Sequence, residues 1–399
     1  MKKLWWLLAS AMLAQKLAKH WLVRRFFARP IPAPTREPEL VSVLQPILSG
    51  DPTLRECLAA NLAVQTRYPL EFIWLVDDDD ATAHTICAEL ASVDSQHAVR
   101  IISSPPPAQH TNPKTIKLVV GLQHAHGDVV CVLDDDTRLP DWGLEQCLPF
   151  LDAPGVGLAF GLPYYRHFGN FWSSMVALFV NDQSLLTYVP YTTLAEPFTI
   201  NGMFYAMRRE VLALVGGFRG LEAILADDFA VASRVRAHGY RLVQTPLRHA
   251  ISTFVRGPRQ YASLMQRWFI FPRESLLRHL KPHERAIVLG LGGLPALFPL
   301  ALVGMLLKNR SPALLLYSGL YFGHSLLTYA EFNHAYLHDV TPSRYIWLIP
   351  LVETLLPLQL VAALVSPQRI VWRDHVMQVE RGGNFRFVRR RDALSRSDQ

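Results

Sequence analysis

The chain has 399 residues, 50% of them hydrophobic, so it has room for a catalytic domain together with a membrane-associated part. Its formal net charge of +7 is concentrated at the two ends: the first 30 residues hold seven Lys or Arg and no acid, and residues 366–399 hold eight Arg and four acids. The middle is therefore acidic on balance, which excludes a basic nucleic-acid-binding face, whereas basic ends beside apolar segments suit anionic lipid headgroups.

The N-terminus predicts a membrane anchor. Residues 4–14 are apolar, but no small-residue cleavage site follows them, so we do not expect a cleaved signal peptide. Lys16 and Lys19 interrupt the apolar pattern, and a lysine at the bilayer centre costs about 3 kcal/mol. We therefore expect residues 1–29 to form an uncleaved anchor that either spans the bilayer or lies in its interface. The Pro-rich residues 30–39 follow as a linker.

From residue 40 onward, strands alternate with helices. The expected strands are 40–46, 71–76, 99–104 and 128–133, and the expected helices are 51–65, 81–93 and 112–125. The first of these helices is expected to begin at Asp51, followed by Pro52. The alternation predicts an α/β fold with a mostly parallel sheet covered on both faces, in which ligands bind beyond the carboxyl ends of the strands. We assign this domain to residues 40–284.

Three apolar segments lie within residues 285–365. Each is close to the roughly 20 residues that span the hydrocarbon core of a bilayer, so each is a candidate transmembrane helix. The segments are 286–307, which carries no charge, 311–330, which contains His324, and 345–365, which contains Glu353 as its single acid.

The basic tail, residues 366–399, conflicts with three complete spans. If the α/β domain lies on the cytoplasmic face, three spans would place the tail outside, whereas positively charged segments usually stay inside. The third segment also contains Pro350, Glu353 and Pro357. We therefore expect it to be re-entrant or interfacial, so that the tail returns to the cytoplasmic side.

The cysteine pattern indicates reduced thiols. The chain has four cysteines, with no CxxC pair and no Cys/His spacing typical of a metal site. They are Cys57, Cys87, Cys131 and Cys147. All four fall in the α/β domain, where we expect them to be buried and reduced in a cytoplasmic compartment.

Acidic residues gather where strands end and where one helix begins. Asp77–Asp80 follow the second strand, Asp134–Asp136 follow the fourth, and the pair Asp227-Asp228 begins a helical segment. Any one cluster has an ordinary explanation, because acids favour loops and helix N-termini. Three clusters together favour a function, because like charges brought together are unfavourable without a cation. A hard divalent cation bound with a nucleotide diphosphate is the natural partner.

An ordered set of motifs runs through roughly residues 40–385. The segments are VSVLQPILSGDPTL (41–54), EFIWLVDDDDATA (71–83), NPK (112–114), VLDDDTRLP (132–140), GLPYY (161–165), NGMFYAMRREVL (201–212), LADDFAVASRVRAHGYRL (225–242), MQRW (265–268) and IVWRDHVMQVERGG (370–383). In their order, more than in any one of them, they resemble the inverting GT-A glycosyltransferases of family 2, and within them ceramide glucosyltransferase. The resemblance implies a GT-A, Rossmann-like catalytic domain.

The resemblance also assigns the donor site. Asp78, supported by Asp80, matches the acidic site that holds the nucleoside, and Pro46 lies beside that pocket. Asp134 and Asp136 match the DxD element, whose carboxylates hold Mg²⁺ or Mn²⁺ on the donor diphosphate. Because successive side chains of an extended segment alternate, these two carboxylates can point to the same side.

The catalytic base comes from the third cluster in this comparison. Asp228 matches the base, and Asp227 lies beside it. The incoming hydroxyl must lose a proton on the face of the sugar opposite the leaving diphosphate, and direct displacement then inverts the anomeric carbon. Lys114 would contact the donor, although a surface lysine at a helix start is the ordinary alternative.

The Q/R-x-x-R-W motif of these enzymes is met only in part. Arg267 and Trp268 are present and would meet the donor, but Leu264 stands where Gln or Arg is expected. Arg and Trp are also ordinary residues of a helix that lies on a membrane. Trp372-Arg373 is a weaker match of the same kind, and residues 170–189 have the composition of an interfacial helix near the lipid acceptor.

These assignments predict a membrane-bound inverting glycosyltransferase that transfers one sugar, glucose from UDP-glucose, to a ceramide-like lipid. Its partners would be a nucleotide sugar, a lipid acceptor and the membrane, with no nucleic acid, and its catalytic domain would lie on the cytoplasmic face. Alternatives are transfer of N-acetylglucosamine or another sugar to a hopanoid, diacylglycerol or other lipid. Two different classes stay open, a membrane metallo-phosphohydrolase and a transporter, although the apolar segments hold few ionisable residues.

Overall fold

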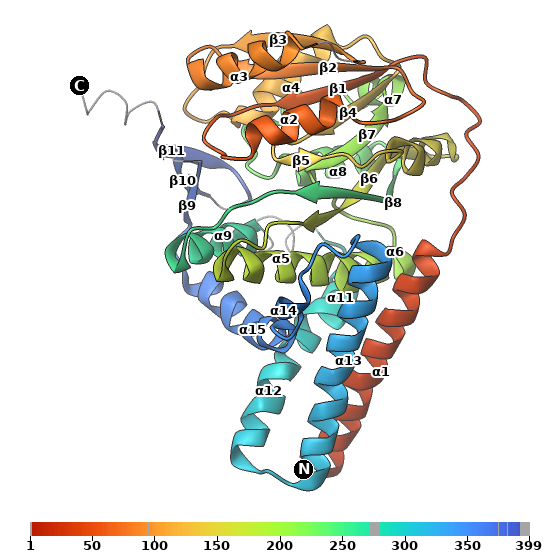
Figure 1. Ribbon diagram of the computed structural model, residues 1–399, viewed down its shortest axis with the longest axis vertical. Helices are drawn as coiled ribbons and strands as arrows, with labels where there is room; N and C mark the ends of the chain where they lie inside the picture. Colours follow the sequence, from red (N-terminus) through yellow and green to blue (C-terminus); the bar gives the residue numbers. More distant parts are fainter. Residues whose placement is uncertain (1, 94–95, 272–279, 374, 381, 392–399) are drawn as a thin grey trace.

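The computed structural model describes residues 2–93, 96–271, 280–373, 375–380 and 382–391, and it shows an α/β domain at one end of a group of long helices (Figure 1). The centre of this domain is an eight-stranded sheet of order β3-β2-β1-β4-β7-β6-β8-β5. Its strands are β1 (Val41–Pro46), β2 (Leu70–Asp77), β3 (Ala98–Ser104), β4 (Val129–Leu133), β5 (Thr137–Arg138), β6 (Val156–Tyr165), β7 (Phe204–Arg208) and β8 (Arg241–Ile251).

The sheet is mixed, which corrects the expectation of a mostly parallel one. The neighbours β3, β2, β1 and β4 are parallel, as the alternation of strands and helices predicts, whereas β7 runs antiparallel to both β4 and β6. The pair β6 and β8 is parallel again, and β5 is antiparallel to β8. The alternation fixes strand direction only where one helix crosses over between neighbouring strands, and no single crossover helix joins β4 to β7.

Helices cover both faces of the sheet, as expected from strands that are buried on both sides. The helices α2 (Leu54–Leu62) and α3 (Ala81–Ala91) pack on one face, and α4 (Pro113–His124), α7 (Arg209–Leu214) and α8 (Asp227–Ala237) pack on the other. Two 3₁₀ turns, Leu144–Gln146 and Leu148–Asp152, complete the first face. The four cysteines are free and buried, as expected, and their cytoplasmic compartment stays a prediction.

The first of these helices begins later than expected. Thr53 is the N-cap residue of α2, and the Asp51 carboxylate accepts hydrogen bonds from the Thr53 backbone N–H (2.8 Å) and hydroxyl (2.7 Å). Asp51 therefore forms a turn ahead of the helix, which is the other common use of an Asp followed by Pro.

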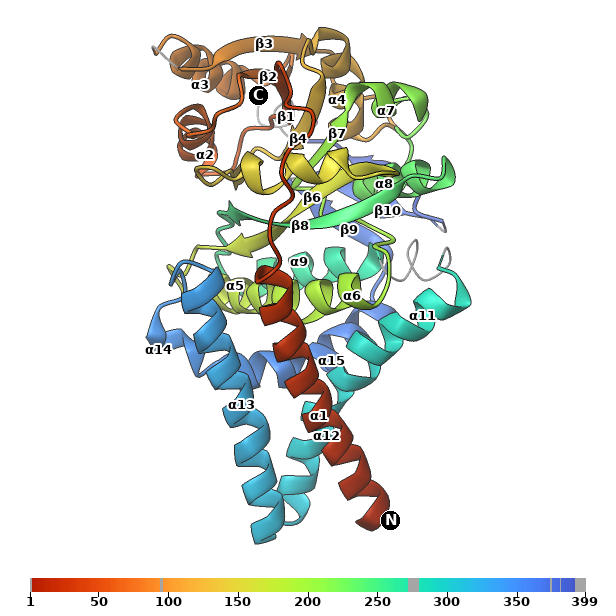
Figure 2. The same cartoon turned by 90° about the vertical axis from the view of Figure 1, so that its right-hand side faces the viewer.

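Three long helices project away from the sheet as a stalk (Figure 2). They are α1 (Lys2–Phe27), α12 (Leu294–Lys308) and α13 (Pro312–Tyr336), and α12 continues α11 (Pro282–Val288) through a π-helical turn at Leu289–Gly293. Trp5 stacks on Phe298 with 5.6 Å between ring centroids, and the Tyr317 hydroxyl donates to the Ala9 carbonyl at 2.6 Å. These contacts tie α1 to α12 and α13.

Within the described residues, one helix is long and apolar enough to cross a membrane, and it spans Pro282–Lys308. This helix contains the first expected span, 286–307. The second, 311–330, forms part of α13, whose buried polar residues Ser318, Ser325 and Thr328 lower its apolarity. The structure thus supports one of the three expected spans, and the anchoring role of α1 stays a prediction.

The basic residues of α1 have partners, which explains how they are accommodated in an apolar segment. Lys16 Nζ lies 2.6 Å from Glu353 Oε1, with only 15% and 11% of the two side chains exposed, and also donates to the Ser325 hydroxyl. Lys19 Nζ donates to the Leu291 carbonyl at 2.6 Å. The acid of the third apolar segment therefore neutralises a lysine of the first helix.

Between the stalk and the sheet lie α5 (Phe171–Gln183), α9 (Pro258–Phe271) and α15 (Ile349–Val365), which we call the helical platform (Figure 1). They share one apolar cluster, which also includes Tyr345 and Ile346 of the short helix α14 (Ser343–Ile346). The short helix α6 (Val189–Leu194) follows α5 after a π-helical turn at Ser184–Tyr188. Figures 1 and 2 show α15 lying across the direction of α12 and α13, and the interfacial placement of residues 345–365 stays a prediction.

The chain then returns to the α/β domain as a second, three-stranded antiparallel sheet that the sequence reading missed. Its strands are β9 (Arg369–Trp372), β10 (His375–Val379) and β11 (Phe385–Arg389), in the order β11-β10-β9. We call it the C-terminal sheet. It packs beside the α/β domain (Figure 1), so this part of the basic tail lies on the same side of the stalk as that domain.

Candidate active site

Asp134, Asp135 and Asp136 follow β4 in a turn, which the Thr137 N–H closes by donating to the Asp134 carbonyl at 3.1 Å. Asp134 and Asp136 remain partly exposed, whereas Asp135 is buried. The Asp134 backbone N–H donates to the Met203 carbonyl at 2.9 Å, which fixes this segment beside the residue that precedes β7. The outer two acids are thus the ones with exposed surface, although a turn replaces the extended backbone on which the expected alternation was based.

Lys114 joins the second and third acidic clusters. Its Nζ lies 2.7 Å from Asp134 Oδ1 and 3.1 Å from Asp227 Oδ2, and donates to the Gly202 carbonyl at 2.9 Å. Burial acts to lower the pKa of Lys114, but the two carboxylates outweigh it and hold that pKa well above its ordinary value. The structure thus places Lys114 between the acids, where it neutralises both and sets their separation.

Asp228 lies beside this bridge and has the properties of a proton acceptor. Burial, and next the charge of Asp227, raise the pKa of Asp228 to about 7, while its Oδ1 accepts a hydrogen bond from the Phe229 N–H at 2.7 Å. Gly202 makes room for it, because a Cβ at this position would lie 2.8 Å from the Asp228 Cβ. A carboxyl that titrates near neutral pH is suited to general-base chemistry.

Asp78 and Asp80 separate into different roles at the end of β2. Asp78 is exposed, so its carboxylate is available to a ligand. Asp80 is buried and caps α3 by accepting from the Ala83 N–H, and it also accepts from the Ser49 N–H (2.8 Å) and hydroxyl (2.5 Å). Burial would raise the pKa of Asp80, but these hydrogen bonds lower it overall. Pro46 ends β1 nearby and is buried.

Asp77, the first acid of the same cluster, takes a structural role that the sequence did not distinguish. Its carboxylate pairs with Lys117 Nζ at 2.9 Å, and the same lysine donates to the Ile47 carbonyl at 2.7 Å. Lys117 lies within α4, 40 positions after Asp77, and no local sequence pattern indicates this pairing. The pair anchors the loop after β1 to α4.

Arg267 and Trp268 of α9 face different surroundings. Arg267 is close enough to Asp136 and Asp134 for their charges to act on it, although burial lowers its pKa overall. Trp268 packs edge-on to Tyr165 and stacks with Phe179 at 6.2 Å between centroids, and Leu264 lies in the same apolar cluster. Leu264 therefore fits the platform, whereas Arg267 reaches toward the acidic edge of the sheet.

Asp135 and Arg373 form a contact that the sequence only hinted at. Arg373 lies beyond β9, and its guanidinium donates to both carboxylate oxygens of Asp135, at 2.5 and 2.7 Å. Asp135 Oδ2 also accepts from the Leu48 N–H at 2.9 Å. The middle acid of the cluster is therefore held on both carboxylate oxygens by protein groups, whereas Asp134 pairs with Lys114 and Asp136 accepts one long hydrogen bond from Thr137.

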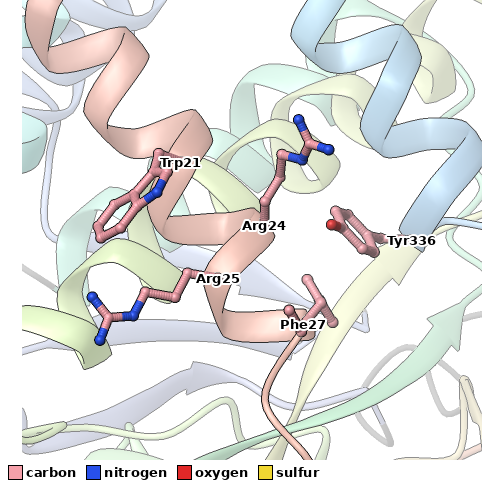
Figure 3. A pocket seen from close by; sticks show the side chains of 6 residues that line it. Trp21, Arg24, Arg25, Phe27 and Tyr336 are labelled. Atoms are coloured by element: carbon pink, nitrogen blue, oxygen red, sulfur yellow. The ribbon is translucent and has the colours of Figure 1, made fainter.

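A cavity of about 500 Å³ lies away from these acids, where α1 and α13 reach the α/β domain (Figure 3). Its lining residues are Trp21, Arg24, Arg25, Phe27, Ala28 and Tyr336. Trp, Tyr and Arg side chains are typical of the level at which a protein meets lipid headgroups. This cavity marks the junction between the stalk and the α/β domain.

A family model and one solved structure agree with this architecture. The model of glycosyl transferase family 21 matches residues 4–385. The mannosyltransferase PcManGT from Pyrobaculum calidifontis, solved with GDP-Man and Mn²⁺, has a similar fold, with a TM-score of 0.52 and 19% identity over 89% of this chain and 95% of that one. GalNAc-T7, solved with UDP, GalNAc and Mn²⁺, aligns over 62% of this chain and 53% of that one, with a TM-score of 0.42 and 12% identity.

The family match decides between the classes that the sequence left open. It covers the α/β domain, the stalk and most of the C-terminal sheet. The predicted relationship to ceramide glucosyltransferases, whose family this is, is confirmed, and the transporter and phosphohydrolase alternatives fall away. The chain belongs to glycosyl transferase family 21 and is a glycosyltransferase that uses a nucleotide sugar.

Proposed function

We propose that this enzyme transfers glucose from UDP-glucose to a ceramide-like lipid at a membrane surface, with inversion at the anomeric carbon. The observation that carries the proposal is the Lys114 bridge, which holds Asp134 of the donor side and Asp227 of the acceptor side on one ammonium group. A single-displacement transferase needs two such acidic sites, one for the donor diphosphate and one for the incoming hydroxyl.

The residues beyond β4 suit a divalent cation, Mg²⁺ or Mn²⁺. Asp136 accepts a long hydrogen bond of 3.4 Å from the Thr137 hydroxyl, and burial followed by the charge of Asp135 raises its pKa to about 7, so a cation would favour its ionised form. Among the described residues no three His, Cys, Asp or Glu side chains are grouped to hold a metal ion. Asp134 and Asp136 would therefore share the cation with donor phosphate oxygens, as the Mn²⁺ in the mannosyltransferase of similar fold also suggests. When bound, the cation supplies Lewis-acid stabilisation of the leaving diphosphate.

The other donor contacts follow from exposure and charge. Asp78 is free to bind the nucleoside, with Pro46 beside it and Asp80 holding the loop between them. Arg267 would face the diphosphate from α9, since it already lies within reach of the charges of Asp134 and Asp136. Trp268 would contact the donor from the platform, where it packs beside Tyr165 at the end of β6.

Asp228 would remove the proton from the acceptor hydroxyl. Its raised pKa makes its carboxylate a stronger base than an exposed aspartate, and the nearby charge of Lys114 offsets only part of that rise. The hydroxyl then attacks the anomeric carbon as the bond to the diphosphate breaks, and the proton stays on Asp228.

The helical platform supports a lipid acceptor and an integral membrane protein. Its helices α5, α9 and α15 separate the acidic edge from the stalk, so a lipid whose tails lie along the stalk could present its headgroup hydroxyl to Asp228 (Figure 1). Pro282–Lys308 would cross the bilayer, and the basic end of α1 favours a cytoplasmic catalytic domain.

The proposal is tested by incubating the purified protein in detergent with UDP-glucose, Mn²⁺ and one acceptor at a time. Ceramide is expected to yield a single-sugar glycolipid. Diacylglycerol and a hopanoid polyol serve as competing acceptors, and UDP-N-acetylglucosamine and GDP-mannose as competing donors. A product from another acceptor, with none from ceramide, would contradict the proposed acceptor while leaving the catalytic residues in place.

A further inference from the structure

The C-terminal sheet touches the loops that surround the proposed donor site. It follows the stalk and platform in the chain, yet it packs against the carboxyl-end edge of the large sheet (Figure 1). Leu225 lies two residues before Asp227, and its N–H donates to the Gly383 carbonyl at 2.9 Å. The Phe387 N–H donates to the Gln109 carbonyl at 3.2 Å, in the loop that leads into α4 and Lys114.

Arg373 forms the bidentate ion pair among these contacts. Its guanidinium donates to both oxygens of Asp135 and, at 2.5 Å, to the Leu48 carbonyl. Asp135 in turn accepts from the Leu48 N–H. The side chains of Arg373 and Asp135 are 19% and 7% exposed, so this bidentate pair is shielded from water and stronger than a surface ion pair. Arg373 thereby fastens the loop after β1 to the segment after β4.

A second arginine extends this contact to the other acidic cluster. Arg391 donates to the Ser49 carbonyl at 2.6 Å and to the Ser49 hydroxyl at 3.0 Å. Ser49 is the residue whose N–H and hydroxyl bind Asp80. Two arginines that follow strands of the C-terminal sheet therefore hold residues 48 and 49, which lie between Asp80 on the proposed nucleoside side and Asp135 on the proposed diphosphate side.

We infer that the C-terminal sheet completes the donor site, with Arg373 as a positioning residue that orients Asp134 and Asp136 through Asp135 and the loop after β1. This inference rests on the proposed donor site. Arg373 fixes Asp135 and thereby fixes the turn that carries both of its neighbours, of which Asp134 meets Lys114 Nζ at 2.7 Å. The donor site is thus built from the α/β domain and the C-terminal sheet, and the stalk and platform lie between these two parts in the sequence.

The alternative is a buried ion pair that only stabilises the fold. If the pair only stabilises the fold, its removal would lower the melting temperature without changing donor affinity in the folded protein. If the pair positions the site, its removal would loosen residues 48–49 and 134–136 and weaken donor binding, while the rest of the sheet stays protected from exchange. The experiment therefore needs a local readout and a binding readout.

The full-length protein in detergent would be compared with Arg373→Ala, Arg373→Lys and Arg391→Ala. Arg386→Ala is the matched control, because Arg386 is an exposed arginine on β11 of the same sheet. Amide hydrogen exchange would be measured without ligand, and the affinity for UDP would be titrated in saturating Mn²⁺. Melting temperature would be recorded for each protein.

We expect Arg373→Ala to speed exchange at residues 48–49 and 134–136, and to weaken UDP binding by about tenfold to a hundredfold, the range for lost charge-assisted hydrogen bonds. Arg373→Lys should restore part of the affinity, since lysine keeps the charge but cannot bind both oxygens in a fixed fork. Arg391→Ala should affect residues 48–49 more than 134–136. Arg386→Ala should match the wild type.

Two results would overturn the inference. The first is unchanged exchange at residues 48–49 and 134–136 in folded Arg373→Ala, and the second is faster exchange there with wild-type UDP affinity. If the wild-type protein binds GDP or another nucleotide and not UDP, the proposed donor is wrong. The same comparison with the bound nucleotide then decides the role of Arg373.

Discussion

Asp228 is the residue on which the proton transfer depends. Asp228→Asn keeps the size of the side chain but cannot accept a proton, so kcat is expected to fall about 100-fold or more while UDP affinity changes little. Steady-state kinetics with UDP-glucose and ceramide, beside a UDP titration, would measure both. Normal turnover in Asp228→Asn together with an inactive Asp227→Asn would assign the base to the other residue of the pair.

The raised pKa of Asp228 also predicts the pH profile. Burial, and next Asp227, raise this pKa to about 7, so the carboxyl is protonated and inactive as a base below that pH. We expect kcat/KM to rise with pH up to about 7 and then to level off, since kcat/KM reports the free enzyme. Saturating Mn²⁺ keeps Asp136 ionised during the measurement. A profile that is flat from pH 5 to 8 would contradict the assignment.

The two partly exposed acids after β4 predict a requirement for a divalent cation. Excess EDTA should abolish transfer, and added Mn²⁺ or Mg²⁺ should restore it. Asp136→Asn should remove most activity at ordinary cation concentration without lowering the melting temperature, because within the described residues the Asp136 carboxylate accepts a single long hydrogen bond. Full activity in EDTA would refute the cation's role.

At the scale of helices, the Lys16–Glu353 pair joins α1 to α15. Removing one partner of a buried ion pair leaves the other unpaired, at a cost of about 3–5 kcal/mol. Lys16→Met and Glu353→Gln should therefore each lower the melting temperature in detergent, and the double variant should lose less than the sum of the two. Arg24→Met, in an exposed 3.6 Å contact with Glu331, is the control and should have little effect. Additive losses would show that the two side chains are not coupled.

For the whole molecule, the contacts of the C-terminal sheet predict topology. Arg373 and Arg391 bind loops of the α/β domain, so both must lie on one side of any membrane that the stalk crosses. In sealed vesicles, a tag after residue 399 should be reached by protease from the same face as the α/β domain. Cleavage of the tag and of that domain from opposite faces would contradict the structure.

Much of the fold could be predicted because it depends on local patterns. The strands β1 to β4 and the helices α2 to α4 follow from apolar runs and helical spacing, and the parallel order of those strands follows from their crossover helices. The start of α8 at Asp227 likewise follows from acids at a helix N-terminus. The direction of β7 could not be predicted this way, because a long insertion containing α5 and α6 precedes it.

The sequence by itself determined the family, the acidic clusters and the basic ends, since these depend on residue types and their order. Tertiary structure alone decided what each acid does, because the role of a carboxylate depends on its partner. Asp77 has Lys117, Asp80 has Ser49, Asp135 has Arg373, and these partners are 31 to 238 positions away. A lysine charge in an apolar segment is unfavourable by itself, and the charge of Lys16 is compensated in the fold by Glu353, which lies 337 positions later in the chain. The energy of an ion pair depends on the distance between the two charges and on how far water is excluded from them. For residues far apart in the sequence, no local pattern contains that information.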